Sequence, residues 1–510
     1  MMSVRSFFSK HKTIWSLSFL YLFLRLYHLT AIPIFNDEAI YLDWGWREIH
    51  HFDLLFYSLY DAKPPLLMWL FGITSLFAPT MLFAGRLVSV IFGYLTFIGI
   101  WKLTKKVGST QMAVLACLLY ICIPIFSFFD RQALMESAIG TIGVWSCLIT
   151  LKLYETEKIR WTFMLGIVLG GGYLIKTSAL VFFVPTMIFL IYDLISKKHI
   201  RGKCITNILV CGFTGFFIVL PMLLQKLYWE TLPTNDRYSL KINEILSIPW
   251  SHWLKLLSDT SQILFFHLTP LPLIVLVVAT IVIIFQGPRY LRYILLWFLI
   301  PLSVDVLVIR EVIERYVVSY LPISLILIAF IFSHGRNTVQ RTIVVTLTIG
   351  SALFITSMQI ISPLRYFSFL SAVSKFALKE YTSGYTSGYG VPEVVAFLVQ
   401  QISDKPAYLM TALHTGNPES GVMTYFLKNP DVVVGYFDSK TTNQTVTDLA
   451  CISSPIPFYF VSRETDQAGM AGFLRQVYYK KSSISNFGIG IYTLRSPCVG
   501  KTLQFSVQHT

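Results

Sequence analysis

The stretch TIWSLSFLYLFLRLYHLTAIPIFNDEAIYLDWGW, residues 13–46, joins a long apolar run to a pair of acids. The run 13–32 is long enough to cross a hydrocarbon core, which takes about 20 helical residues. Pro33 ends it, because proline breaks a continuing helix, and Asp37 and Glu38 then stand side by side. Adjacent carboxylates at the edge of a membrane repel each other, so we predict that they serve a function.

The composition extends the membrane assignment to most of the chain. Of 510 residues, 55% are hydrophobic and 13% are charged, whereas roughly a quarter are charged in soluble domains. Apolar runs recur from residue 13 to residue 361 and are continuous, while a β-barrel would show alternating segments of about ten residues. The sequence therefore predicts a polytopic α-helical membrane protein, with its first span retained as an anchor.

The formal charge of +14 does not indicate a nucleic-acid partner. Basic residues concentrate in short loops between the apolar runs, and the positive-inside rule assigns such loops to the cytoplasm. We therefore expect a multi-pass protein of the plasma (cytoplasmic) membrane, with a cytoplasmic N-terminus and an extracytoplasmic C-terminus. Eleven transmembrane spans are predicted, at about 13–32, 82–101, 111–128, 137–153, 161–175, 178–195, 205–224, 262–285, 291–309, 316–333 and 342–361.

Three parts follow from this topology. Residues 1–365 form the transmembrane domain, in which the outer loop 33–80 holds short interfacial helices. Residues 393–510 alternate helical and β-branched runs, which predicts a soluble extracytoplasmic α/β domain. Between them, 366–392 contains a Tyr-Thr-Ser-Gly repeat that favours a flexible linker, although a ligand cradle is the alternative. Cys451 and Cys498 would pair if this tail lies in an oxidising compartment.

Ionisable residues near the membrane share one side in this topology. Two interpretations remain open: ion pairs and extended side chains at the level of the lipid headgroups, or a charged cavity that opens outward. Convergence from five separate regions favours the cavity. The residues are Asp37, Glu38, Asp61, Lys63, Asp130, Arg131, Glu136, Lys176, Asp305, Arg310, Glu311, Glu314 and Arg315.

The chemistry of these side chains suggests a transfer reaction. Lys63 precedes Pro64 and Pro65, which stiffen the chain, and Lys176 follows a glycine run that permits close packing. Lysines and arginines around one cavity would bind an anion, most naturally a phosphate. A carboxylate such as Asp37 is suited to take a proton from a hydroxyl nucleophile. Together they indicate transfer of a group from a phosphate leaving group to an alcohol.

The same residues resemble a known family. Asp37–Glu38, Lys63-Pro64-Pro65, DRQALMES (130–137), Lys176 and ERYVVSYLP (314–322) resemble motifs of the GT-C glycosyltransferases, of the protein O-mannosyltransferase and aminoarabinose transferase kind. The resemblance covers roughly residues 10–365. It implies a polyprenyl-phosphate-linked sugar donor and an inverting displacement on the non-cytoplasmic face, by a hexosyl or pentosyl transferase that requires no cofactor.

The resemblance also assigns roles to residues. Asp37 would be the general base, Glu38 would shape the site beside it, and Glu136 would orient the acceptor or the base. Phosphate binding falls to Lys63, Lys176, Arg131 and Arg315. The predicted substrate-lining residues are Tyr41, Asp61, Asp130 and Tyr316.

Some features leave alternatives open. Ala62 stands where aminoarabinose transferases carry a Glu before the lysine, so acceptor contacts do not transfer directly. A divalent cation held by Asp37 and Glu136 is possible, but the lysines make it unnecessary. The competing function is a lipid-linked sugar transporter or flippase, which inverted repeats would favour, and no internal repeat is evident. The sugar and the acceptor, whether lipid, polysaccharide or protein, are not specified by the sequence.

Overall fold

The computed structural model describes residues 4–196, 201–334, 338–374, 378–382, 384–402, 405–412, 416–437, 456–463, 474–481 and 487–494. Cys451 and Cys498, whose pairing the sequence leaves open, lie outside these residues. The chain forms two compact units. The first holds Met1–Leu29, Leu55–Leu67 and Arg86–Ala377, and the second holds Thr30–Leu54, Met68–Gly85 and Leu378–Thr510. The second unit therefore joins most of the predicted outer loop to the predicted tail domain.

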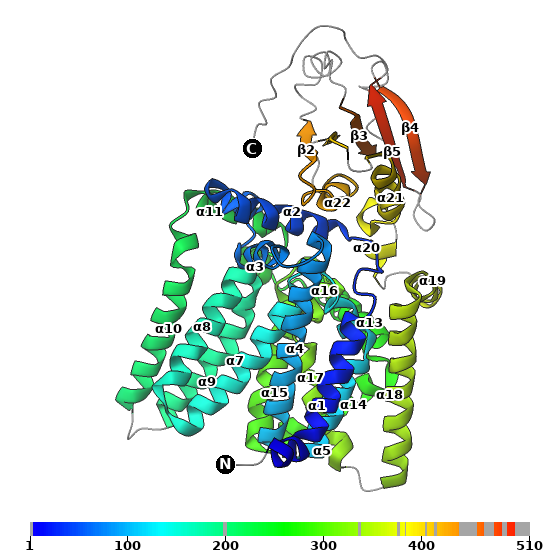
Figure 1. Cartoon of the computed structure of the whole chain (residues 1–510). Coiled ribbons are helices and arrows are strands. Elements are labelled where there is room, and N and C mark those ends of the chain that lie inside the picture. Colours follow the sequence, from blue (N-terminus) through cyan, green and yellow to red (C-terminus); the bar gives the residue numbers. More distant parts are fainter. Residues whose placement is uncertain are drawn as a thin grey trace. The chain divides into compact units, whose positions relative to one another are not determined.

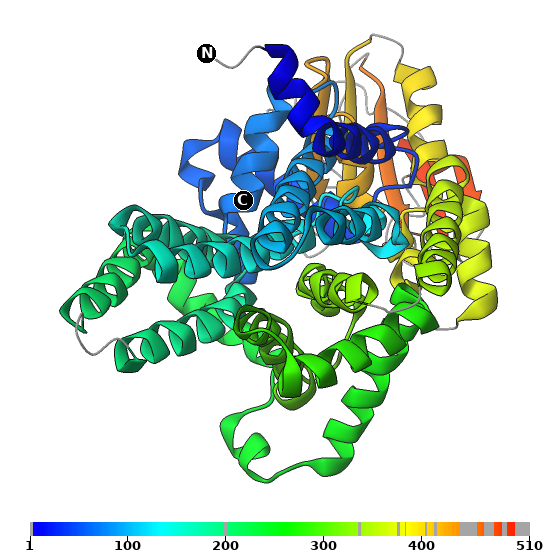
Figure 2. The same ribbon diagram turned by 90° about the horizontal axis from the view of Figure 1, so that it is seen from below.

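The first unit is helical (Figure 1). Its elements are α1 (Val4–Leu26), η2 (Tyr57–Asp61), most of α4 (Met81–Val107), α5 (Thr110–Cys122), α6 (Pro124–Phe129), α7 (Glu136–Thr156), α8 (Ile159–Ile175), η3 (Thr177–Phe182), α9 (Phe183–Ser196), α10 (Arg201–Leu223), α11 (Lys226–Thr231), η5 (Leu232–Arg237), α12 (Ile242–Leu246), α13 (Trp250–Leu268), α14 (Pro270–Gln286), α15 (Arg289–Leu307), α16 (Glu314–Val317), α17 (Leu321–His334), α18 (Thr338–Ile361) and α19 (Pro363–Val373). Helices α7 to α10 pack together and form the cyan-to-green group in Figure 2.

The helices confirm a multi-pass membrane fold, but the predicted count of eleven spans is wrong. In the described part of the chain, six helices are long and apolar enough to cross a membrane, or seven if one bent pair counts as a span. The six coincide with the predicted spans at 82–101, 137–153, 178–195, 205–224, 291–309 and 342–361.

Of the other five predicted spans, 13–32 overlaps the 23-residue helix α1, which ends at Leu26, and four fall on helices that are broken or short. The run 111–128 breaks at Ile123–Pro124, and α8 and α17 have 17 and 14 residues, short of the roughly 20 that a span needs. The predicted span 262–285 crosses the junction of α13 and α14, which are bent by 120° at Thr269. Hydropathy detects the apolar run but not the break inside it.

The second unit contains a mixed β-sheet with helices. The strands β1 (Ala407–Ala412), β2 (Val432–Phe437), β3 (Phe458–Arg463), β4 (Leu474–Lys481) and β5 (Gly488–Leu494) lie in the order β2-β1-β3-β5-β4. The first three are parallel, and β5 is antiparallel to both of its neighbours. The other elements are α2 (Asn36–His50), η1 (Phe52–Leu54), most of α3 (Leu66–Ser75), α20 (Lys379–Thr382), η6 (Tyr385–Ser387), α21 (Val391–Ile402) and α22 (Glu419–Thr424).

This sheet confirms the predicted α/β tail. The run 407–412 is buried at five of its six positions, as expected for a parallel strand next to the centre of a sheet. Strand β4 was not predicted, because its sequence LRQVYYKK is rich in polar residues. It lies at the edge of the sheet, where polar and charged side chains protect the open hydrogen-bonding groups.

Candidate functional site

A buried carboxylate with two cations forms the centre of the candidate site in the first unit. The Glu136 Oε1 atom lies 3.3 Å from Lys176 Nζ and 3.1 Å from Arg315 Nε. The side chain of Glu136 is 1% exposed, whereas those of Lys176 and Arg315 are 23% and 11% exposed. Both cations therefore keep access to a ligand while the acid behind them is enclosed.

Helix ends place these three residues. Glu136 is the first residue of α7, where the partial positive charge of a helix N-terminus favours a carboxylate. Lys176 follows directly on the last residue of α8, and its backbone is extended, with φ −159° and ψ 131°. Arg315 lies on the short helix α16 after α15. Residues 136, 176 and 315 are far apart in sequence, so the packing of the helices brings them together.

Glycines in α8 permit that packing. A Cβ on Gly170 would lie 2.7 Å from the backbone oxygen of Gly215 in α10, and one on Gly172 would lie 2.8 Å from the Ile142 side chain in α7. Neither neighbour leaves room for a larger residue. Small residues thus seat α8 between α7 and α10, which fixes the position of Lys176 beside Glu136.

Lys63 reaches the same site from the segment after η2. Ala62 has φ +54°, a left-handed conformation that a non-glycine residue adopts at a cost of about 1–2 kcal/mol. Hydrogen bonds from Ala62 N to Leu59 O (2.9 Å) and from Lys63 N to Ser58 O (3.1 Å) hold this turn. The next two residues, Pro64 and Pro65, restrict the chain further. The turn and the prolines thus fix the backbone position from which the Lys63 side chain extends.

The positive charge of Lys63 acts on Lys176, and each of the two lysines lies beside an aromatic ring. Burial lowers the pKa of Lys176, and the positive charges of Arg315 and Lys63 act in the same direction, while Glu136 opposes them. The Lys176 Nζ atom lies 5.4 Å from the centre of the Tyr316 ring, and Lys63 Nζ lies 5.2 Å from that of Tyr238. Three cations, two of them held beside aromatic rings, form an arrangement that attracts an anion.

Asp61 stands at the edge of this site. Its Oδ2 atom lies 3.8 Å from Lys63 Nζ, and its Oδ1 accepts a hydrogen bond of 3.1 Å from Arg237 Nη2. Arg237 ends η5, and the residues after it form a short antiparallel bridge, Ser239 with Ile309. This bridge joins the segment after α11 to the segment between α15 and α16.

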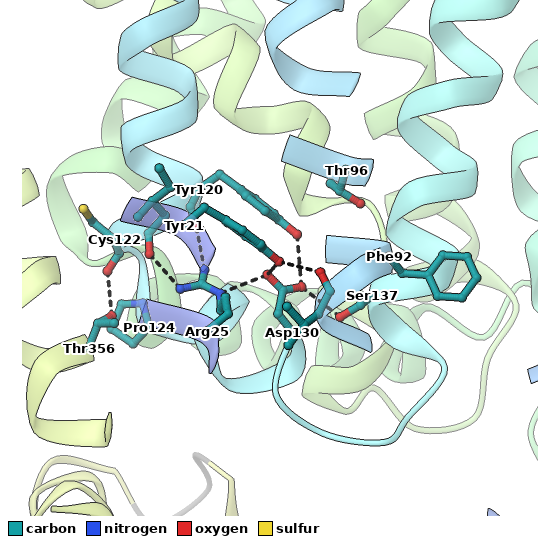
Figure 3. Close-up of polar contacts among 12 residues, drawn as sticks. Tyr21, Arg25, Phe92, Thr96, Tyr120, Cys122, Pro124, Asp130, Ser137 and Thr356 are labelled. Carbon is teal, nitrogen blue, oxygen red and sulfur yellow. Dashed lines mark hydrogen bonds and ion pairs between the residues drawn. The ribbon is translucent and has the colours of Figure 1, made fainter. Parts of the chain in front are cut away.

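Asp130 belongs to a separate, enclosed network (Figure 3). Its Oδ2 accepts hydrogen bonds from Tyr21 Oη (3.0 Å) and Arg25 Nε (3.2 Å), and its Oδ1 accepts from Tyr120 Oη (3.1 Å) and Ser137 Oγ (2.9 Å). Asp130 is 2% exposed. Its partner Arg25 was not predicted to be functional, although an arginine inside an apolar run is itself a signal.

Arg131 is likewise not part of the Glu136 cluster. It is 1% exposed, and its Nη2 atom donates to the backbone oxygens of Tyr27 (2.9 Å) and His28 (2.6 Å). Arg86 donates to the next oxygen, that of Leu29, at 3.0 Å. These two arginines hold the turn that follows α1. The roles of Asp130 in substrate lining and of Arg131 in phosphate binding stay predictions.

The predicted acids Asp37 and Glu38 lie on α2, in the second unit. Glu38 is fully buried, and its Oε2 accepts a hydrogen bond of 3.0 Å from Phe35 N, so it caps the helix. Asp37 is partly exposed, and Asn36 Nδ2 lies 3.4 Å from its Oδ1. Tyr41 is 4% exposed and packs near Trp44, with ring centres 5.9 Å apart. Asp37 is thus the acid of the pair with access to solvent.

No group of three or more His, Cys, Asp or Glu side chains suited to a metal ion occurs among the residues that the structure describes. The divalent cation considered for Asp37 and Glu136 stays a prediction. The Tyr-Thr-Ser-Gly repeat contributes α20 and η6, where Tyr381 is buried and the Tyr385 ring centre lies 4.5 Å from the Arg463 guanidinium carbon. The repeat is therefore packed by its tyrosines.

Comparison with known proteins agrees with this architecture. Residues 62–229 match the family model described as dolichyl-phosphate-mannose-protein mannosyltransferase. No curated protein matches the chain. ArnT from Cupriavidus metallidurans bound to undecaprenyl phosphate superposes with a TM-score of 0.57 at 13% identity, covering 96% of this chain and 100% of that one.

Two further structures are similar. Apo ArnT from the same organism gives a TM-score of 0.57 at 12% identity, over 96% of this chain and 98% of that one. The Archaeoglobus fulgidus oligosaccharyltransferase in complex with Zn and sulfate gives 0.49 at 11% identity, over 90% and 68%. This chain is a multi-pass membrane protein with the fold of the GT-C glycosyltransferases, and its residues 62–229 carry the sequence pattern of the dolichyl-phosphate-mannose-protein mannosyltransferase family.

Proposed function

We propose that this chain is an inverting glycosyltransferase that moves a sugar from a polyprenyl-phosphate-linked donor to an acceptor hydroxyl on the non-cytoplasmic face of the membrane. The observation that carries the proposal is the convergence of Lys176 and Arg315 on the buried carboxylate of Glu136, with Lys63 near enough to act on Lys176. The ArnT structure with undecaprenyl phosphate supports a polyprenyl phosphate as the lipid.

The cations supply the electrostatic part of the reaction. As the bond between the anomeric carbon and the phosphate oxygen breaks, negative charge develops on the departing polyprenyl phosphate. Lys63, Lys176 and Arg315 stabilise this charge, since fixed cations in a partly buried site interact strongly with it. Tyr316, whose ring lies beside Lys176, lines the groove for the lipid phosphate.

Asp37 supplies the base. The acceptor oxygen forms the new bond to the anomeric carbon, and its proton passes to the Asp37 carboxylate. The polyprenyl phosphate leaves with the electron pair of the broken bond, so the step balances. This assignment rests on the motif in the sequence and on the partial exposure of Asp37, compared with the buried, capping Glu38. Glu38 and Tyr41 shape α2 around it.

Glu136 organises the cations and remains able to meet the acceptor. Its Oε1 serves both Lys176 and Arg315, and its Oε2 has no hydrogen-bond partner among the described residues. A buried carboxylate oxygen costs free energy until it accepts a hydrogen bond. An acceptor hydroxyl would satisfy it, which matches the predicted role of Glu136 in orienting the acceptor. Asp61, in turn, orients Lys63.

The distribution of charge supports the proposed orientation in the plasma membrane. At the helix ends opposite Glu136, Lys106 of α4 pairs with Glu155 near the end of α7. Lys203 of α10 pairs with Glu157 just beyond it, at 3.0 Å. Lysines at that end are expected on the cytoplasmic side, which supports the proposal of a cytoplasmic N-terminus.

One observation favours the alternative of a lipid-linked sugar transporter. Transporters contain broken helices, and α13 and α14 are bent by 120° at their junction. In transporters, however, the binding groups lie at such breaks near the membrane centre. Here the clustered charges stand at the start of α7 and just after the end of α8. The enzyme is therefore the better supported function.

The test is a release assay with the full chain purified in detergent. Undecaprenyl-phosphate-linked hexose and pentose donors are supplied with a total lipid and polysaccharide extract of the cell envelope, and free undecaprenyl phosphate is measured. We expect release by the wild type and none by Asp37→Asn, while Lys176→Gln weakens binding of undecaprenyl phosphate. Lys226→Gln, at a 91% exposed side chain paired with Glu230, is the control. Donor binding without release in any acceptor mixture would favour the transporter.

A further inference from the structure

The tail domain holds the first turn of α2, the helix that carries Asp37. Asn417 makes two hydrogen bonds to this turn: its backbone N donates to Asn36 Oδ1 (2.9 Å), and its Nδ2 donates to the Ile34 backbone oxygen (2.8 Å). Asn417 is 1% exposed. A buried residue with one backbone and one side-chain hydrogen bond to the residues just before Asp37 leaves that turn little freedom to move.

Two glycines let the tail approach so closely. Gly388 has φ +72°, and a Cβ there would lie 1.9 Å from the Ile34 backbone oxygen. Gly416 has φ +96°, and a Cβ there would lie 2.0 Å from Asn36 Oδ1. Both positions thus require glycine for their conformation and for their space. The segments that contain Gly388 and Gly416 thus both fit closely against the start of α2.

Further contacts hold the residue just before α2 and the helix itself. The Phe35 and Tyr381 rings stack with centres 4.1 Å apart. Seven residues after Asn36, Asp43 Oδ2 accepts a hydrogen bond of 3.2 Å from Tyr436 Oη on β2. Helix α22, which follows Asn417, packs against α2. The tail therefore touches α2 at its start and along its length.

We infer that Asn417 is a positioning residue for the transfer reaction, and that the tail domain acts by fixing the first turn of α2 so that Asp37 meets the acceptor hydroxyl in one orientation. This inference rests on the proposed function of Asp37. A general base works only within hydrogen-bond reach of the proton it takes, and a displacement of about 1 Å can cost on the order of a hundredfold in rate. Helix α2, which carries Asp37, is thus in the same compact unit as the tail domain.

The experiment compares Asn417→Ala with Thr493→Val in the full chain. Thr493 lies in the same domain and donates to the Phe458 backbone oxygen at 3.0 Å, within the sheet and away from α2. In the release assay we expect Asn417→Ala to lower kcat on the order of 10- to 100-fold. The KM for the donor should stay within about twofold, since the phosphate is bound by Lys63, Lys176 and Arg315. Thr493→Val should change neither.

Hydrogen exchange of the peptide containing residues 33–41 supplies a readout independent of activity. We expect faster exchange in Asn417→Ala than in the wild type or in Thr493→Val. If Asn417→Ala fails to fold, Asn36→Ala removes the other hydrogen bond, the one that Asn36 Oδ1 accepts from Asn417 N, and should also lower kcat. The double variant loses both hydrogen bonds to this turn and should be at least as slow as the slower single variant.

The outcomes separate the inference from the proposed function. Wild-type kcat and wild-type exchange in folded Asn417→Ala, together with an inactive Asp37→Asn, would overturn the inference and leave the function standing. An active Asp37→Asn would instead overturn the assignment of the base, and with it the catalytic part of the inference. A rise in donor KM equal to the fall in kcat/KM would also contradict a positioning role.

Discussion

The Lys176 ammonium lies 3.3 Å from the same Glu136 oxygen that Arg315 approaches at 3.1 Å. A single buried carboxylate thus holds two cations that would otherwise repel each other. Such a pair of cations is stable without further help only while the carboxylate stays ionised. A bound phosphate would also compensate the two positive charges, because it is itself negatively charged.

Replacing Glu136 by Gln should lower stability and make it depend more strongly on the lipid phosphate. The substitution keeps the shape but removes the negative charge that Lys176 and Arg315 share, which should cost about 1–3 kcal/mol. Added undecaprenyl phosphate should then raise the melting temperature of Glu136→Gln by more than that of the wild type, as followed by tryptophan fluorescence. Glu244→Gln, at an exposed acid paired with Arg310, should behave as the wild type. An equal lipid effect in all three proteins would refute the phosphate site.

Arg315→Gln should raise the KM for the donor by about tenfold, which corresponds to 1.4 kcal/mol. A charge-assisted bond to phosphate is lost, while Lys176 keeps its contact with Glu136. Arg310 provides a matched control, since it lies five residues earlier and its side chain is 39% exposed, paired with Glu244. Arg310→Gln should leave the donor KM unchanged. Similar KM values for the two variants would remove Arg315 from the site.

Chain direction and hydropathy together indicated which residues share one end of the helices. Glu136 begins an apolar run, and Lys176 and Arg315 stand beside the ends of others, so alternating spans place them on one side. What could not be predicted is the length of each helix. The break between α13 and α14 depends on the local conformation of Thr269 (φ +68°), which hydropathy does not report.

Long-range polar partners were also beyond the sequence. Arg25 and Asp130 are 105 positions apart, and only Asp130 was predicted to have a role. Asn417 is 383 positions from Ile34 and belongs to no motif. Its role depends on glycines at 388 and 416. The need for glycine there comes from close contacts with Ile34 and Asn36, which only the folded structure shows. Periodicity gives the elements, whereas these contacts depend on how the elements pack.

Ala62→Gly and Ala62→Pro should differ in their KM for the donor. Glycine adopts φ +54° without strain, so Ala62→Gly should keep both donor affinity and stability near those of the wild type. Proline fixes φ near −65° and removes the bond from Ala62 N to Leu59 O. Ala62→Pro should therefore displace Lys63 and raise the donor KM several-fold. Equal donor KM values in the two variants would mean that this turn does not position Lys63.

Asp130→Asn tests whether the residue lines the substrate or supports the fold. Removing the charge leaves the buried guanidinium of Arg25 uncompensated, which should cost about 3–5 kcal/mol. Tyr120→Phe removes one of the four hydrogen-bond donors and should cost about 1 kcal/mol. Thermal unfolding in detergent measures both. A stable Asp130→Asn protein with a raised acceptor KM would instead establish the residue as part of the substrate site.

Stability of the second unit should fall at alkaline pH through Tyr436. Burial raises the pKa of Tyr436, and the neighbouring Asp43 carboxylate raises it further. The folded state therefore keeps the tyrosine proton above pH 10, the approximate pKa of a tyrosine in an unfolded chain. Its contribution is complete below that pH and decreases as the pH rises further, because the unfolded chain then loses the proton that the folded one retains. Tyr436→Phe should cost about 1 kcal/mol at neutral pH and should lose less stability between pH 9 and pH 11 than the wild type. The melting temperature over this range, with exchange of the peptide 33–41 as the local readout, measures the difference. An identical alkaline decline in both proteins would show that the bond from Tyr436 to Asp43 does not hold α2.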